Sequence, residues 1–127
     1  MLRNYKDLKV WQKSYLLCLK IYEVTKEYPG EEKFGLSAQS RRASVSVPSN
    51  IAEGYGRQST KQYIQQLYVS YGSICEIETQ ILPAKDLNYM VEEIFCTIIS
   101  LTLEVERMLI ALIRSLENKV KNRIKSC

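Results

Sequence analysis

The chain has 127 residues, close to the commonest size of a single domain, and its 46% hydrophobic and 25% charged residues exclude a wholly disordered chain. Its net charge of +4 is mild, so it permits an acidic partner such as RNA without requiring one. The sequence contains no histidine, which excludes Ser–His and Cys–His nucleophile pairs and every zinc site that uses histidine.

The first predicted helix spans about residues 7–28, because apolar residues recur there at alternating spacings of three and four. These residues are Leu8, Trp11, Tyr15, Cys18 and Tyr22. We expect Asp7 to cap this helix or to supply an acid in its first turn, and Pro29 with Gly30 to end it.

The second predicted helix spans about residues 33–55 and is rich in small side chains, which let a neighbouring helix come close. Its expected inner stripe is Leu36, Ser40, Ala43, Val47, Asn50 and Gly54. Pro48 removes one backbone donor and leaves the carbonyl near Ser44 to find another partner.

The third and fourth predicted helices span about residues 59–87 and 91–119, and a basic tail follows at 120–127. Ser59 is a favourable cap for the third helix. The stripe of the third helix is Ile64, Leu67, Tyr71, Ile74, Glu78 and Ile81. The stripe of the fourth is Val91, Ile94, Ile98, Leu101, Val105, Met108 and Leu112.

Long helices joined by short turns run antiparallel to their neighbours, and spacings of three and four favour bundle packing. We therefore predict one all-α domain over residues 1–127, an antiparallel up-and-down four-helix bundle. Further apolar residues lie off these stripes: Leu16, Leu17, Ile21, Val69, Ile77, Phe95, Ile99, Leu103, Leu109 and Ile110. They indicate either a broad core or a subunit interface, and their abundance on the fourth helix favours a homo-oligomer.

The sequence offers no catalytic, cofactor-binding or metal-binding constellation. Its four cysteines are far apart, with no CxxC pair, and no apolar segment is long enough to cross a bilayer. The first residues lack the apolar stretch of a signal peptide. We therefore expect a cytoplasmic protein with free thiols, without a membrane partner or cofactor.

The string from Asn50 to Gly54 is the most distinctive in the chain. As a structural element, Asn50 would bind backbone groups freed by Pro48, and Gly54 would let the chain turn with positive φ. A ligand site is the alternative. We interpret Pro48, Asn50, Glu53 and Gly54 as structural positions.

Glu78 lies on an apolar stripe, where an unpaired carboxylate is costly. Antiparallel packing of the second and third helices would bring Arg41 to it, within or between subunits, as a structural ion pair. A carboxylate poised for acid–base work is the alternative. Glu76 does not support that alternative, since residues two apart on a helix face different directions.

Basic residues form three groups that indicate a nucleic-acid surface. The first follows the outer face of the first helix, the second the ends of the second helix, and the third the tail. The candidates are Lys6, Lys9, Lys13, Lys20, Arg41, Arg42, Arg57, Lys61, Lys121, Arg123 and Lys125. A solvated helix face is the alternative; in an oligomer, however, repeated phosphate contacts would give strong, salt-sensitive binding.

Four sequence strings, taken together, resemble the bacterial 23S rRNA intervening-sequence proteins, a family of four-helix bundles. They are Leu8-x-Val10-Trp11-Gln12, Arg41-Arg42-Ala43, Ser46-Val47-Pro48-Ser49-Asn50-Ile51-Ala52-Glu53-Gly54 and Gly72-Ser73-x-x-Glu76-x-Glu78-Thr79. By this resemblance Glu76 and Glu78, like the Asn50–Gly54 turn, are signature positions of structural character.

The resemblance implies a setting and partners but no enzyme activity. Such proteins are typically encoded inside insertions in large-subunit rRNA genes, and related bundles assemble as homopentameric rings. One relative, the accessory protein of diversity-generating retroelements, binds nucleic acid together with a reverse transcriptase. The sequence therefore predicts a non-enzymatic homo-oligomer, expected to be a pentamer, that binds RNA or a nucleic-acid-processing protein. A protein-interaction scaffold without nucleic-acid affinity is the alternative.

Overall fold

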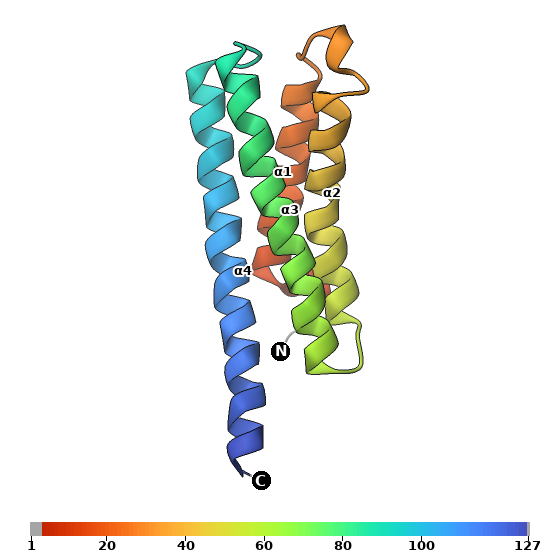
Figure 1. Cartoon of the computed structure of the whole chain (residues 1–127), viewed down its shortest axis with the longest axis vertical. Coiled ribbons are helices and arrows are strands. Elements are labelled where there is room, and N and C mark those ends of the chain that lie inside the picture. The colour runs from red at the N-terminus through yellow and green to blue at the C-terminus, as the bar shows by residue number, and fades with distance from the viewer. Residues whose placement is uncertain (1–3, 127) are drawn as a thin grey trace.

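The computed structural model describes residues 4–126, with side chains through Arg123. Within this range lie two short 3-10 helices and four α-helices (Figure 1). Their bounds are η1 Tyr5–Asp7, α1 Lys9–Thr25, η2 Gly30–Glu32, α2 Leu36–Tyr55, α3 Thr60–Asp86 and α4 Glu92–Ser126. Consecutive α-helices run in opposite directions along one long axis, so the predicted all-α, antiparallel up-and-down bundle is confirmed.

The first helix is shorter than the predicted span 7–28, and the expected cap at Asp7 is wrong. Asp7 instead ends η1, where Asn4 forms the cap: the Asn4 side chain accepts a bond from the Lys6 backbone (2.7 Å). The Asp7 carboxylate accepts a bond in return from the Asn4 backbone (3.4 Å). Helix α1 then ends at Thr25, several residues before Pro29.

The second helix begins at Leu36 rather than at 33, because a separate 3-10 turn precedes it. The Glu32 carboxylate accepts a hydrogen bond from the Leu36 backbone (3.1 Å) and another from the Tyr89 hydroxyl (2.8 Å). The backbone bond first, and then the tyrosine bond, hold the pKa of Glu32 below its usual value. Glu32 thus accepts a bond from a free backbone N–H group at the start of α2 and connects this end of the helix to the α3–α4 turn.

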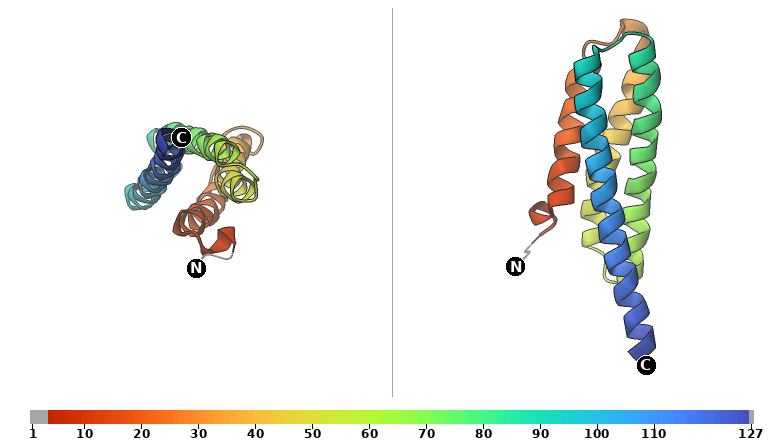
Figure 2. Two further views of the ribbon diagram at one scale, coloured as in Figure 1. Left: turned by 90° about the horizontal axis from the view of Figure 1, so that it is seen from below. Right: turned by 90° about the vertical axis from the view of Figure 1, so that its left-hand side faces the viewer.

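The fourth helix continues to Ser126, so its predicted end at about 119, before the basic tail, is wrong. No glycine or proline follows residue 119, and lysine and arginine are good helix formers, so nothing there stops the helix. The last turns of α4 extend beyond the end of the bundle (Figure 2). Helix α3 lies within a residue of its predicted span, and Ser59 caps it by accepting a bond from Gln62 (3.2 Å).

The core is built from aliphatic side chains of all four helices, and on α1 it differs from the predicted stripe. The buried residues of α1 include Val10, Leu17, Ile21 and Val24, whereas Tyr15 and Tyr22 stay 46% and 39% exposed. Aliphatic side chains carry no polar group into the core, so they occupy it in preference to tyrosine. Of the residues off the predicted stripes, Leu17, Ile21, Ile77 and Leu109 are core, and Leu16, Val69 and Leu103 are exposed.

Helices α2 and α3 approach closely, as the small residues of α2 predict. Ser70 donates a hydrogen bond to the Val47 carbonyl, and Ser73 donates one to the Ser46 hydroxyl, both at 2.8 Å. Bonds this short from serine require the two backbones to lie close together. Within residues 4–126, no helix is both long and apolar enough to cross a membrane.

Candidate nucleic-acid interface

A basic groove lies between the first turns of α3 and the last turns of α4, with a volume of about 570 Å³. Its cations are Lys61 from α3 and Arg114 and Lys121 from α4, and its apolar lining includes Ile64 and Val120. We call this surface the basic groove. It is the place where the folded chain brings basic side chains from two helices together.

One carboxylate, Glu117, also lines the basic groove, but it is engaged by a neighbour. The Tyr68 hydroxyl donates a hydrogen bond to Glu117 (3.0 Å), and this bond, more than desolvation, raises the pKa of Tyr68. The groove therefore carries three cations against one carboxylate that already has a donor. It has the charge and the polar donors that suit a phosphate backbone.

The local sequence explains why these cations converge. Ser59 starts α3, so Lys61 falls in its first turn, where the free backbone N–H groups add partial positive charge. Arg114 and Lys121 are seven residues apart on a continuous helix and therefore share one face. The sequence-based candidates missed Arg114, and its spacing from Lys121 was the signal that could have found it.

The other basic candidates lie elsewhere, and several have partners. Lys13 pairs with Glu104 (3.2 Å), Arg57 pairs with Glu53 (2.6 Å), and Lys6 lies over the Tyr5 ring. None of the α1 lysines Lys9, Lys13 and Lys20, nor Lys6, lines the basic groove. Arg42 and Arg123 are exposed, and the side chain of Lys125 lies outside the described residues.

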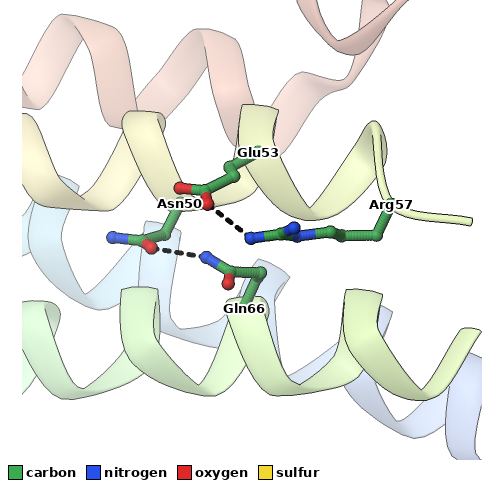
Figure 3. A network of polar contacts seen from close by, with 4 residues as sticks. All are labelled: Asn50, Glu53, Arg57 and Gln66. Carbon is green, nitrogen blue, oxygen red and sulfur yellow. Dashed lines mark hydrogen bonds and ion pairs between the residues drawn. The ribbon is translucent and has the colours of Figure 1, made fainter. Parts of the chain in front are cut away.

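Asn50 joins α2 to α3 in a polar network (Figure 3). Gln66 donates a hydrogen bond to the Asn50 side-chain oxygen (2.7 Å), and the Asn50 amide donates to the Ser46 carbonyl (2.8 Å) and hydroxyl (3.0 Å). The expected partner was the Ser44 carbonyl, which Pro48 deprives of its helical donor. The prediction named the wrong acceptor, because the Asn50 side chain reaches back one turn of its own helix.

Gly54 does not turn the chain, and the expected positive φ is wrong: within the described residues no glycine has one. Gly54 lies inside α2 and is buried against α3. A Cβ there would come within 2.8 Å of the Gln66 Cβ and 3.0 Å of a Tyr63 ring carbon. Its role is close helix contact.

Glu78 faces another carboxylate rather than a cation, so the predicted ion pair with Arg41 does not form within the chain. Arg41 donates to the Thr25 hydroxyl (2.8 Å) and stacks on the Tyr22 ring (4.9 Å). Burial, followed by the hydrogen bond with Glu106 and the negative charge of that group, raises the pKa of Glu78 to about 7. Glu76 is exposed on the other side of α3.

A second groove, of about 970 Å³, lies between α1 and the start of α4. Val24, Met90, Ile94 and Ile98 supply its apolar lining. Its charged residues are Lys20, Glu23, Glu27, Lys85, Asp86 and Glu92. We call it the α1–α4 groove; no pattern in the sequence had indicated it. Among the residues described, no three cysteine or acidic side chains are grouped to hold a metal ion.

Comparisons with known proteins agree with the fold. The family model of the 23S rRNA-intervening sequence proteins matches residues 6–111. The chain is also similar to a Bacteroides thetaiotaomicron protein of unknown function from the S23 ribosomal protein family, solved by crystallography. The two share 25% identity and a TM-score of 0.76, over 82% of this chain and 97% of the other. No curated protein sequence matches the chain.

Proposed function

Because this chain belongs to the family of 23S rRNA-intervening sequence proteins, we propose that it is a non-enzymatic, homo-oligomeric RNA-binding protein of the cytoplasm. The observation that carries the proposal is the basic groove, where Lys61, Arg114 and Lys121 converge from two helices. A ring of five chains is the expected assembly, as in related bundles. A nucleic-acid-processing protein is a further expected partner.

The chemistry of the basic groove favours the RNA backbone over the bases. Lysine and arginine bind phosphate oxygens, and arginine can do so with two parallel hydrogen bonds. Such contacts supply affinity without reading sequence. In an oligomer each chain adds one groove, so several moderate contacts combine into tight binding through effective concentration.

The test is a titration of labelled structured and single-stranded RNA, followed by fluorescence anisotropy at several salt concentrations. The variant Lys61→Glu with Lys121→Glu reverses two charges of the groove. We expect its affinity to fall by roughly tenfold or more, as for the loss of several phosphate contacts. The matched control, Lys9→Glu with Arg42→Glu, makes the same charge change on exposed helical positions outside the groove.

Two results would contradict the proposal. One is an absence of detectable binding by the unmodified chain at low salt. The other is an equal loss of affinity in both variants, which would indicate a diffuse charge effect rather than binding in the groove. Circular dichroism of each variant establishes that it is folded.

A protein-interaction scaffold without nucleic-acid affinity is the second candidate. It is favoured by exposed apolar side chains on α1, where Tyr15, Leu16 and Leu19 are each nearly half exposed. Under this alternative, a partner isolated with the tagged chain remains bound after nuclease treatment. Under the main proposal, nuclease releases it.

A further inference from the structure

Two surfaces that include α1 complement each other: one is shared with α2, and the other is shared with the start of α4. The first, which we call the α1–α2 strip, consists of Tyr15, Leu19, Tyr22 and Lys26 together with Arg41 and Val45 of α2. The second is the α1–α4 groove. We propose that the α1–α2 strip of one chain docks in the α1–α4 groove of a second copy. This inference rests on the homo-oligomer clause of the proposed function and names its contact surfaces.

The α1–α2 strip is apolar with basic charge at one end. Its members Tyr15, Leu19 and Tyr22 follow helical spacings of four and three, so they form one continuous row. Their exposed fractions of 46%, 48% and 39% are high for large apolar residues. Arg41 lies over the Tyr22 ring at 4.9 Å, which places its charge at the Tyr22 end of the row.

The α1–α4 groove offers the opposite character. Its apolar surface includes Ile94, which is 43% exposed, and its boundary carries the acids Glu23, Glu27, Asp86 and Glu92. Of the two lysines in its lining, Lys85 already pairs with Glu92 (3.8 Å). Without that pair, the lining holds Lys20 against Glu23, Glu27 and Asp86, so the groove is acidic. Lys26 and Arg41 of a docked strip would then meet carboxylates while the apolar side chains of the two surfaces pack together.

The position of the two surfaces favours a closed assembly. Leu19 and Tyr22 of the strip and Glu23 and Val24 of the groove lie on the same turns of α1, and Lys26 and Glu27 follow directly after its last residue. With 3.6 residues per turn, the two sets are centred about 120° apart around the helix axis. Two different surfaces on one chain make a head-to-tail contact, and an angle of this size between them turns successive chains around an axis, as a closed ring requires.

Two single variants test the two surfaces independently. Leu19→Glu places an acid on the strip, opposite the acidic groove, and Ile94→Arg places a cation in the groove, opposite the basic strip. Both positions are about half exposed, so both variants are expected to fold. Light scattering should find the unmodified chain as an oligomer and each variant alone at the mass of one chain, 14.7 kDa.

Mixing the two variants is the decisive step. Each variant retains one intact surface, so the mixture should form a dimer held by the groove of the Leu19→Glu chain and the strip of the Ile94→Arg chain. The remaining strip and groove carry opposite new charges and can pair as well, so any complex larger than one chain that forms only in the mixture supports the proposal. A mixture that stays at one-chain mass would overturn the proposal.

The remaining outcomes distinguish this inference from the proposed function. If the unmodified chain is an oligomer and both variants keep its mass, the docking inference fails and homo-oligomerisation stands. If the unmodified chain is a monomer, both fail, while the RNA titration still decides the role of the basic groove. A monomer whose Leu19→Glu variant loses RNA affinity would assign the strip to RNA and overturn the docking inference.

Discussion

At the residue scale, Gly54 and Glu78 lie in contacts between helices where a substitution should change the stability of the fold. Gly54 lies where α2 touches α3, with Gln66 and Tyr63 occupying the space of a side chain. Glu78 shares the α3–α4 contact with Glu106, while Cys75 and Tyr71 lie beside the pair on α3. Each position leads to a measurable consequence for stability.

Replacement of Gly54 by alanine should destabilise the protein despite the better helix propensity of alanine. The new methyl group would overlap α3, and overpacking of this kind costs roughly 1–3 kcal/mol. Gly72→Ala is the matched control, because that glycine is exposed within α3 with nothing in the path of a Cβ. The control should gain up to about 1 kcal/mol in urea unfolding. Equal changes in the free energy of unfolding for the two variants would contradict close packing of Gly54 against α3.

Glu78 should make stability fall as the pH rises toward neutrality. Its folded-state pKa of about 7 lies above the ordinary value of 4.5, so the folded chain binds more protons than the unfolded chain between these values. The free energy of unfolding therefore decreases as pH rises through this window. Glu78→Gln should remove this slope and gain on the order of 1 kcal/mol at pH 8, after allowance for solvent screening of a partly exposed pair.

Thermal unfolding of the unmodified chain and Glu78→Gln between pH 4.5 and pH 8 measures this effect. Glu76→Gln, on the exposed side of the same helix, is the control and should leave the slope unchanged. Parallel stability curves for the unmodified chain and Glu78→Gln would contradict the raised pKa of Glu78 beside Glu106. The measurement concerns the carboxyl pair alone and is independent of RNA binding.

At the element scale, the α2–α3 contact depends on serines and one amide pair rather than on large side chains. Ser70 and Ser73 bond directly to α2, and the Asn50–Gln66 bond lies one turn farther along. Such bonds are short only if the helices keep one register. The polar network therefore fixes how α2 and α3 align, while the aliphatic core supplies most of the stability.

A double-mutant cycle on Asn50→Ala and Gln66→Ala should reveal this coupling. Since the pair is partly buried and joins two helices, we expect an interaction energy of about 0.5–3 kcal/mol. The neighbouring Glu53–Arg57 pair, visible in Figure 3, is exposed and joins the last turn of α2 to a residue just after the helix. Its cycle should give only about 0.3–0.5 kcal/mol. Similar energies for both pairs would contradict a special role for Asn50 in helix register.

At the scale of the whole molecule, the surfaces with proposed roles are separated along the bundle. The basic groove lies at the end where α3 begins, next to the protruding turns of α4 (Figure 1). The α1–α2 strip and the α1–α4 groove include the last turns of α1, toward the opposite end. Assembly through α1 would therefore leave every basic groove open to RNA on one side of a ring.

This separation predicts that RNA binding and assembly of the chains respond differently to salt. Three groove cations displace counterions from RNA, so the logarithm of affinity should fall with the logarithm of salt by a slope of about 2 per chain for single strands. Assembly rests mainly on apolar contact and should change much less. Anisotropy and light scattering over one salt series test both, and an RNA affinity that does not depend on salt would contradict phosphate binding.

The sequence by itself determined the helical class, the number of helices and their antiparallel order, because apolar periodicity and turn residues are local signals. It also placed the small residues of α2 and the cap at Ser59 correctly. Prediction from the sequence failed where the surroundings of a side chain depend on the helix that packs against it. Whether Tyr22 or Ile21 enters the core, and whether Glu78 meets Arg41 or Glu106, depends on which helix lies opposite.

Only the tertiary structure decided which basic residues form a site. Lysines are scattered along the sequence, and helical spacing relates them within one helix but not between helices. The antiparallel packing of α3 and α4 brings Lys61 beside Arg114 and Lys121, more than fifty residues away in the chain. The packing of α4 beside α1 creates the α1–α4 groove, and no single stretch of sequence encodes it because a groove forms between two surfaces.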